Sequence, residues 1–504
     1  MNPMKATPVA RRCRRLAAAF SGLAVFSLAA HGANPKPNVV LFYADDMGYG
    51  EIQRFHPERS KVPTPHLNQL CDEGMMFTDA HTSSSVCTPS RYALLTGRYN
   101  WRTRHQSGVA QGGKPCLIAA DRMTLASLFK AQGYQTAMFG KWHLDFQYQV
   151  PKGARTPEYR ADVWNYGMPV GTVIPDGPVS RGFDYFLGFH HSRTMSSLIE
   201  NDTVVEYIKC VDVMQRLADA VIGTIDEHAR TGRETPFFIY YPMNSPHQPV
   251  VPRDEWKGRS GINNPYTDFV AQTDDAVGQV LKALEKNGLK ENTIVLFATD
   301  NGCHKPADTF LKDGHAVSGP LRDRKTSIHD GGHRVPFIVR WPGVVEAGSR
   351  SDQLVCMTDL FATFAEFFAF EYADDTAEDS IGFLSILKGV APEVARGTIV
   401  HHDFKGRFAV REGDWKLILR PDDKVKGATG LEAKFQLYHM KHDIAEADNL
   451  ANETPEKVDT LVKLLEKQVA DGRSTPGAAQ QNDTKVDIWK KKKRAASKKL
   501  KPHE

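Results

Sequence analysis

Cys87 begins the segment whose residue types and spacing best combine for chemistry. It opens the string Cys-Thr-Pro-Ser-Arg-Tyr-Ala-Leu-Leu-Thr-Gly-Arg, which ends at residue 98. Pro89 and Ser90 favour the start of a helix, because proline is tolerated in the first turn. Cys87 would then lie at a helix N-terminus that favours an anion, with the cationic Arg91 one turn further on. Taken alone, Cys87 would be interpreted as a buried thiol or as a catalytic thiolate.

Carboxylate and amide side chains follow two other short apolar segments. Asp45 and Asp46 follow the first, and Asp300 and Asn301 follow the second. Oxygen ligands of this kind suit Ca²⁺ or Mg²⁺ rather than zinc. Each pair alone is equally compatible with a turn or a helix cap. The four residues together form a candidate metal-ligand set.

Two lysines and two histidines lie in similar positions: Lys141, His143, His247 and Lys325. Histidine titrates near neutral pH and can transfer protons, while lysine supplies positive charge to an anion. A single residue of either type is more often structural or solvated, so these assignments depend on the surrounding motifs.

Near-continuous apolar runs precede these polar clusters, at residues 38–43, 135–139, 237–241 and 293–298. Such runs are typical of strands buried on both faces of a sheet. Apolar periodicity predicts helices between them, at residues 122–132 and 267–287. The alternation predicts an α/β fold in which helices sandwich a large, mostly parallel sheet. Ligands of such sheets bind beyond the carboxyl ends of strands, so the polar clusters would converge on one site.

The pattern changes near residue 400. Two strands flank Glu412-Gly413-Asp414, at 408–411 and 415–419; a third strand at 435–438 and a helix at 455–471 follow. They predict a smaller subdomain with an antiparallel sheet and a helix. We therefore expect a catalytic domain at 34–395, a C-terminal α+β subdomain at 396–473 and a basic, disordered tail at 474–504.

The N-terminus has the layout of a secretory signal peptide, predicted at 1–33. Five cations precede an apolar run that ends in small residues near Ala30. An uncleaved anchor is the alternative interpretation. The sequence thus predicts an exported protein, periplasmic or secreted, with no stable membrane insertion after cleavage.

The formal net charge of +4 comes from the two basic ends of the chain, and the rest of the chain is acidic. Residues 1–33 contribute five positive charges and residues 490–504 a net seven, which leaves −8 for the rest. The charge pattern therefore gives no indication of nucleic-acid binding, and we expect none. The seven cysteines are scattered, which predicts mostly buried thiols, with room for one or two disulfides.

The string from Cys87 to Arg98 resembles the signature of the type I sulfatase family, the arylsulfatase-like members of the alkaline phosphatase superfamily. The resemblance covers roughly residues 36–345. Asp145 and Asp323 stand where the family usually has glycine, and Asp330 stands where it has glutamate. Further family elements are matched by Pro37-Asn38-Val39-Val40 leading to Asp45-Asp46-Met47-Gly48, Gly140-Lys141-Trp142-His143, Ser245-Pro246-His247, Thr299-Asp300-Asn301-Gly302, and Lys325 with the block 330–336.

This resemblance implies a sulfate ester hydrolase. A maturation enzyme would oxidise Cys87 to formylglycine (3-oxoalanine), whose hydrate attacks sulfur with one hydroxyl and expels sulfate with the help of the other. Lys141, Lys325 and Arg91 would supply positive charge, His247 with Lys325 would assist the leaving alcohol, and His143 would take a proton from the hydrate. One Ca²⁺ ion would be bound by Asp45, Asp46, Cys87, Asp300 and Asn301.

Two alternatives stay open from the sequence. One is a phosphonate or phosphodiester hydrolase of the same superfamily, and the other is a non-catalytic protein that binds sulfated glycans. The resemblance favours sulfated carbohydrates as substrates. We expect the segment 144–195 to help line the pocket, with Asp145, His190, His191 and Arg193 as candidates, whereas Trp101 and Arg102 would pack beneath the signature.

Overall fold

Four parallel strands form the centre of a ten-stranded sheet in the computed structural model, which describes residues 36–155, 167–232, 234–392, 395–419 and 428–490. They are adjacent in the order β9 (Thr293–Thr299), β1 (Asn38–Asp45), β8 (Phe237–Pro246) and β4 (Gln135–Lys141). These are the four runs predicted from the sequence, and their carboxyl ends meet at one edge. The predicted α/β class is confirmed.

The outer strands make the sheet mixed. β10 (Phe337–Arg340) is antiparallel to both of its neighbours, and β6 (Ser197–Glu200) is antiparallel to β5 (Tyr185–Phe189). The remaining short strands are β2 (Met75–Phe77), β11 (Ser349–Ser351) and β7 (Thr203–Tyr207) in this sheet, with β3 (Ala80–His81) and β12 (Val355–Cys356) forming a separate pair.

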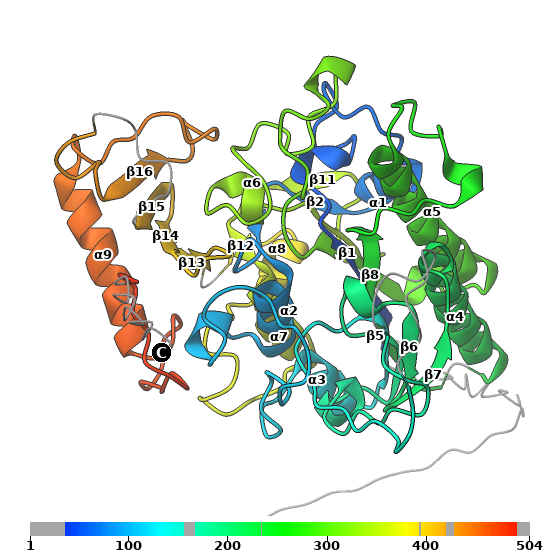
Figure 1. The fold of residues 1–504 in the computed structure, drawn as a ribbon. Coiled ribbons are helices and arrows are strands. Elements are labelled where there is room, and N and C mark those ends of the chain that lie inside the picture. Colours follow the sequence, from blue (N-terminus) through cyan, green and yellow to red (C-terminus); the bar gives the residue numbers. More distant parts are fainter. Residues whose placement is uncertain (1–35, 156–166, 233, 393–394, 420–427, 491–504) are drawn as a thin grey trace, which may run out of the picture. The chain divides into compact units, whose positions relative to one another are not determined.

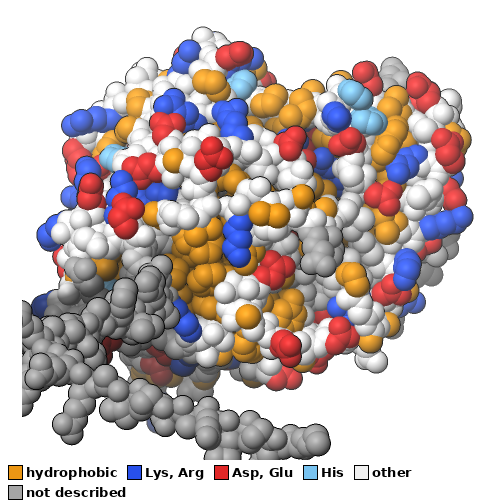
Figure 2. Space-filling model, turned by 180° about the vertical axis from the view of Figure 1, so that it is seen from behind, with side chains coloured by type: hydrophobic (Ala, Val, Ile, Leu, Met, Phe, Trp, Pro, Cys, Tyr) orange, Lys and Arg blue, Asp and Glu red, His pale blue; other side chains and the backbone are white. Residues whose placement is uncertain are grey.

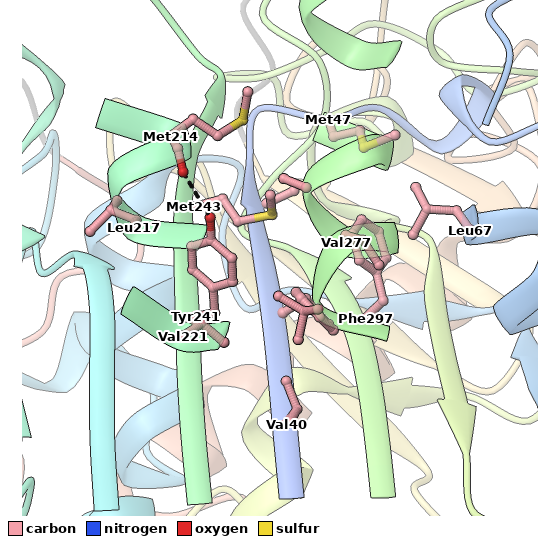
Figure 3. Packing of buried hydrophobic residues seen from close by; sticks show 14 of the residues in the cluster. Val40, Met47, Leu67, Met214, Leu217, Val221, Tyr241, Met243, Val277 and Phe297 are labelled. Atoms are coloured by element: carbon pink, nitrogen blue, oxygen red, sulfur yellow. Dashed lines mark hydrogen bonds between the residues drawn. The ribbon is translucent and has the colours of Figure 1, made fainter. Parts of the chain in front are cut away.

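Helices cover both faces of the sheet (Figure 1). Val40 and Phe42 of β1 point to one face, where α1 (Pro65–Glu73), α4 (Cys210–Arg230) and α5 (Pro265–Lys286) pack, as Figure 3 shows around Val40. The alternate residues of β1 contact the opposite layer. This double burial explains why the strand sequences are apolar almost throughout. The opposite layer contains α2 (Cys87–Thr96), α3 (Leu125–Ala131), α7 (Leu360–Phe368) and α8 (Leu384–Leu387).

Two predicted helices differ from the structure at their starts. The helix predicted from residue 122 begins at Leu125, because Thr124 and Ser127 form a capping box there. The helix predicted from residue 267 begins at Pro265, because the side chain of Asn264 accepts a hydrogen bond from the backbone N–H of Tyr266.

The C-terminal part has the predicted antiparallel sheet with α9 packed on it (Figure 1). Its strands are β13 (Thr398–His402), β14 (Phe408–Glu412), β15 (Trp415–Leu419) and β16 (Phe435–His439), and α9 spans Pro455–Ala470. Residues 37–504 cluster as one compact unit. The two predicted boundaries therefore lie inside that unit and stay predictions.

The predicted disorder of the tail is wrong for residues 474–490. Ile488 and Trp489 pack into the apolar cluster beneath α9. Buried arginines also bind this segment, since Arg98 donates to Asp483 at 2.9 Å and Arg102 to Asn482 at 3.0 Å. A few anchors order a stretch whose overall composition is polar. Residues 491–504, like the predicted signal peptide, lie outside the described part.

The described residues contain six free, buried cysteines and no disulfide. Among the same residues, no helix is long and apolar enough to cross a membrane. Acidic and basic side chains are interspersed on the face seen in Figure 2, which fits the mixed composition of the body.

Candidate active site

The carboxyl ends of β1 and β9 bring the predicted oxygen ligands together. The backbone N–H of Asp46 donates to Asp300 Oδ1 at 3.2 Å, and Asn301 Nδ2 donates to Asp46 Oδ1 at 2.8 Å. Asp45 ends β1 and is fully buried beside them. Because the two strands are parallel neighbours, residues 255 positions apart become hydrogen-bond partners.

Cys87 is the first residue of α2, as the sequence predicted. Thr88 Oγ1 donates to the carbonyl of His143 at 2.9 Å, which joins the helix start to the segment after β4. Ser90 Oγ donates to the carbonyls of Ser84 and Val86 at 3.0 and 3.1 Å. The signature thus holds its own N-terminus in place and leaves the end of the helix dipole at Cys87.

Arg91 contacts a metal-ligand candidate rather than the cavity. Its Nη2 and Nε lie 2.7 and 3.0 Å from Asp300 Oδ2, and its Nη1 donates to the carbonyl of Lys141 at 3.2 Å. The side chain is fully buried. Arg91 therefore orients Asp300 and adds positive charge from behind the site.

The two predicted lysines contact the carboxylates of the site. Lys141 Nζ is 2.7 Å from Asp45 Oδ2; Lys325 Nζ is 2.5 Å from Asp46 Oδ1 and 3.4 Å from Cys87 Sγ. Burial alone would raise the pKa of Asp46, but Lys325 and His247 lower it below its usual value. Carboxylates that stay ionised at this depth are suited to bind a cation.

Cys87 is not a thiolate in this environment. Burial raises the pKa of its thiol to about 12, against the opposing effect of Lys141 and Lys325. A protonated, buried thiol is a poor nucleophile, which disfavours the plain cysteine-nucleophile interpretation.

A cavity of about 150 Å³ joins these groups. Five of the six predicted catalytic residues line it: Cys87, Lys141, His143, His247 and Lys325. The wall is completed by Val86, Val109, Ala110, Gln111, His191, Ser192, Arg193, Thr326 and Phe404. A volume of this size admits an anion such as sulfate.

His143 is held as a neutral base. Its Nε2 lies 3.0 Å from the carbonyl of Ala110, which only accepts, so Nε2 carries the proton. Its Nδ1 is buried and has no hydrogen-bond partner among the described residues. Burial lowers the pKa of His143 well below the usual value, with Lys141 adding to the effect.

His247 faces the acidic side of the cavity. Its Nδ1 is 2.5 Å from the carbonyl of Gln248, and its Nε2 is 3.6 Å from Asp46 Oδ2. Burial lowers the pKa of His247 to about 4. An anionic group bound beside the ring would raise that pKa again, which couples its protonation to ligand binding.

The acidic group fits a hard divalent cation. Asp45 Oδ1 and Asn301 Oδ1 are buried, and within the described ranges neither has a hydrogen-bond partner. Ligand atoms of Asp45, Asp46, Cys87 and His247 all lie within 4.8 Å of one another. Carboxylate and amide oxygens suit Ca²⁺ or Mg²⁺. His247 was predicted only as a proton-transfer group, so its place in this group is an addition.

Of the four candidates in 144–195, two reach the cavity: His191 and Arg193. Asp145 instead accepts from the backbone N–H of Gly112 at 2.9 Å and from Arg104 at 3.3 Å, so it is structural. His190 is buried and packs edge-on against Phe146. Trp101 and Arg102 are fully buried, as expected, with the guanidinium 4.3 Å from the indole ring centroid.

The departures from the family pattern have local explanations. Asp145 and Asp323 replace glycine and have φ angles of 58° and 62°. This left-handed region favours glycine, and aspartate is one of the few other residues that tolerate it. Asp330 lies in α6 (Asp330–His333), where its buried Oδ1 accepts from Lys416 at 2.7 Å.

Several residues near the site were missed from the sequence. Ser192 Oγ donates to Asp45 Oδ2 at 3.4 Å, and His304 Nδ1 lies 3.6 Å from Asp46 Oδ2. His304 follows Asn301 by three residues, so its place beside the motif was a usable signal. Ser192 lies in the segment 144–195 that we expected to line the pocket, although it was not named as a candidate. Phe404 offered no signal, because it comes from a turn that only the fold brings to the cavity.

Comparisons with known protein families and sequences found several matches. The family model "Sulfatase" matches residues 37–369, and "N-sulphoglucosamine sulphohydrolase, C-terminal" matches residues 323–475. An N-acetylgalactosamine-6-O-sulfatase of Bacteroides thetaiotaomicron is 29% identical, covering 86% of this chain and 93% of its own. Human arylsulfatase A is 30% identical over 92% of each chain.

Solved structures share the fold. A Bacteroides thetaiotaomicron structure, from work on the metabolism of multiple glycosaminoglycans, superposes with a TM-score of 0.73 at 28% identity, covering 86% of this chain and 99% of that one. The phosphonate monoester hydrolase of Agrobacterium radiobacter has the same fold, with a TM-score of 0.56 at 18% identity, covering 86% of this chain and 94% of that one.

Proposed function

Because the chain belongs to the sulfatase family and is a sulfuric ester hydrolase, we propose that it cleaves sulfate esters of carbohydrates using formylglycine at position 87 and one Ca²⁺ ion. One observation carries the proposal. Cys87 begins a helix at the base of a small cationic cavity, beside buried oxygens of Asp45 and Asn301 that have no hydrogen-bond partner among the described residues. The carbohydrate part is supported by the relative named as an N-acetylgalactosamine-6-O-sulfatase.

The chain's own residues divide the work. Asp45, Asp46, Asp300 and Asn301 would hold the ion, which supplies positive charge beside the sulfate and the nucleophile. Residue 87, once oxidised and hydrated, would supply two hydroxyls on one carbon: one to attack sulfur as the alcohol leaves, and one whose deprotonation would let the aldehyde re-form and release sulfate. Lys141 and Lys325 place two further positive charges at the cavity floor, and Arg91 keeps Asp300 oriented.

Two histidines of the cavity lining would then move protons. His143, neutral and with an unprotonated Nδ1, takes the proton from the second hydroxyl. His247 gains its proton as the anionic substrate binds, and it passes that proton to the leaving oxygen together with Lys325. Their different surroundings make one histidine a base and the other an acid, and this two-step hydrolysis needs both.

We also propose a maturation enzyme as a partner and an exported location for the protein. A formylglycine-generating enzyme must oxidise Cys87 before the segment folds, because the thiol is almost completely buried afterwards. The N-terminal sequence favours export to the periplasm or the medium.

Mass spectrometry of the peptide containing residue 87 tests the modification, and assays on paired sulfate and phosphonate esters test the chemistry. Hydrolysis of a sulfated sugar by the matured protein is the expected result. A preference for phosphonate or phosphate diesters would instead support the alternative hydrolase. Unmodified Cys87 in a fully active preparation would contradict the proposal.

Calcium should stabilise the folded protein, because it binds groups that only the fold assembles. At a free concentration of about 100 Kd, one bound ion adds about 2.7 kcal/mol. We expect the melting temperature to rise when Ca²⁺ replaces EGTA, and the rise to disappear in Asp46→Asn. Asp459→Asn, at an exposed carboxylate of α9, is the matched control and should keep the full rise. An equal melting temperature with and without Ca²⁺ in the wild type would contradict the metal assignment.

His247→Gln should lower activity most on esters whose leaving group must be protonated. We expect kcat/KM to fall about 10²- to 10⁴-fold on a sulfated sugar, the range for loss of a general acid. The fall should be much smaller on 4-nitrophenyl sulfate, because its phenolate leaves without protonation. His442→Gln, at an exposed histidine, should change neither substrate. Equal losses on both esters would show that His247 serves only the structure or the ion.

A further inference from the structure

A second cavity shares part of its wall with the first. It has a volume of about 330 Å³ and shares Lys325, Thr326 and Phe404 with the sulfate cavity. We call it the groove. Its remaining lining residues are Asp323, Arg324, Ser327, Ile328, His329, Lys405 and Arg407. Any group attached to the sulfated sugar and pointing this way would enter it.

Phe404 lies where the two cavities meet and is 44% exposed. It sits on the turn between β13 and β14. Asp403 organises that turn by accepting from the backbone N–H groups of Lys405 and Arg407, each at 2.9 Å. The carbonyl of Phe404 also accepts from Gly108 at 2.8 Å. An exposed ring on an internally bonded turn offers a fixed apolar platform, suited to the C–H face of a sugar.

The groove carries cations although the body of the chain is acidic. Four of them line it together with one carboxylate, Asp323. Two of the four are ion-paired, Lys325 with Asp46 and Arg407 with Asp403, which leaves Arg324 and Lys405, both exposed, as the cations that can meet a ligand. The carboxylate of Asp323 already accepts from Ser327 at 2.8 Å and lies 2.8 Å from the ring of His329. Arg324 and Lys405 therefore place exposed positive charge where an incoming anion would enter the groove.

We propose that the groove binds an anionic sugar unit joined to the sulfated one, with its ring against Phe404 and its carboxylate or second sulfate at Arg324 and Lys405. The occupant is part of the same substrate chain, because the groove and the sulfate cavity share Lys325, Thr326 and Phe404 and are therefore direct neighbours. The inference rests on the proposed function and refines it. The preferred substrate is then an anionic oligosaccharide rather than a lone sulfated sugar.

Steady-state kinetics on matched substrates test the groove. Substrates are a sulfated monosaccharide and three disaccharides that add a neutral sugar, a uronate or a second sulfated sugar. We expect the wild type to prefer the anionic disaccharides. In Arg324→Gln and Lys405→Gln, the ratio of kcat/KM between anionic and neutral disaccharides should fall about tenfold, the effect of one charge-assisted hydrogen bond. Lys463→Gln, an exposed lysine on α9, should leave the ratio unchanged. The two anionic disaccharides distinguish a carboxylate from a sulfate.

A binding measurement separates the groove from the proposed chemistry. Calorimetric titration of unmatured Cys87→Ala with the desulfated uronate disaccharide needs no turnover. We expect binding by this variant and about tenfold weaker binding when Arg324→Gln or Phe404→Ala is added, with circular dichroism as the check of folding. Equal affinity in all of these variants, or equal substrate ratios in the kinetics, would overturn the groove assignment. Binding without sulfate release in the matured enzyme would leave the groove standing and reject the proposed function.

Discussion

Cys87→Ser, left unmatured, is expected to lose multiple turnover by about 10⁴- to 10⁶-fold, the range for removal of an enzyme nucleophile. Serine can accept the sulfuryl group at the same place, beside Lys325 and at the N-terminus of α2. It has no second hydroxyl on the same carbon, so it cannot expel sulfate by forming an aldehyde. The sulfated serine would therefore persist.

Mass spectrometry and a burst assay measure this result together. One equivalent of alcohol should be released and the peptide containing residue 87 should gain one sulfate. Cys71→Ser, at a buried cysteine of α1 remote from the cavity lining, is the control and should retain turnover per folded molecule. Sustained turnover by Cys87→Ser, with modification excluded by mass, would reject the formylglycine mechanism.

Lys416→Met is expected to destabilise the fold by about 3–5 kcal/mol, the cost of removing one partner of a buried ion pair. Lys416 of β15 is fully buried, and its Nζ lies 2.7 Å from Asp330 Oδ1 and 2.7 Å from Glu446 Oε1. Without it, Glu446 and Asp330 remain buried side by side, and Asp330 keeps the longer ion pair with Arg334 at 3.5 Å. The free energy lost is that of desolvated charge, not of packing, since methionine nearly preserves the volume.

Denaturant unfolding with and without Ca²⁺ measures the loss of stability and also any change in the stabilisation by Ca²⁺. α6 carries Asp330, and the carbonyl of Gly332 in α6 accepts from the backbone N–H of Gly302, next to the proposed ligand Asn301, at 2.9 Å. We therefore expect weaker Ca²⁺ stabilisation in Lys416→Met as well. Lys463→Met breaks an exposed pair with Asp459 and should not shift the midpoint. Matching midpoints for the two variants would contradict the role given to the buried lysine.

The strands and the residues that follow them could be predicted because their signals are local. An apolar run such as 38–43 can be buried on both faces only in the middle of a covered sheet, which predicted its parallel neighbours. Asp45 and Asp46 follow the run directly, so placing the strand also placed the carboxylates. The same holds for Asp300 and Asn301 after β9.

Local sequence could not predict how the C-terminal sheet meets the catalytic residues. Lys416 and Asp330 are 86 positions apart, and neither residue alone indicates a buried partner. Phe404 reaches the cavity only because the turn between β13 and β14 lies beside the loop that carries Lys325. The order of residues 474–490 likewise comes from Arg98 of the signature and from Arg102 just beyond it, far away in the chain.

The sequence by itself thus determined the family resemblance, the central strands and the chemical groups around Cys87, since each is encoded by neighbouring residues. Only the tertiary structure decided which groups face the cavity. In the folded protein Arg91 contacts Asp300, Asp145 accepts structural hydrogen bonds, and burial raises the pKa of the Cys87 thiol so that it stays protonated. The physical reason is burial: desolvation and long-range charge pairs set orientation and pKa, and both depend on residues that the chain brings together only when it folds.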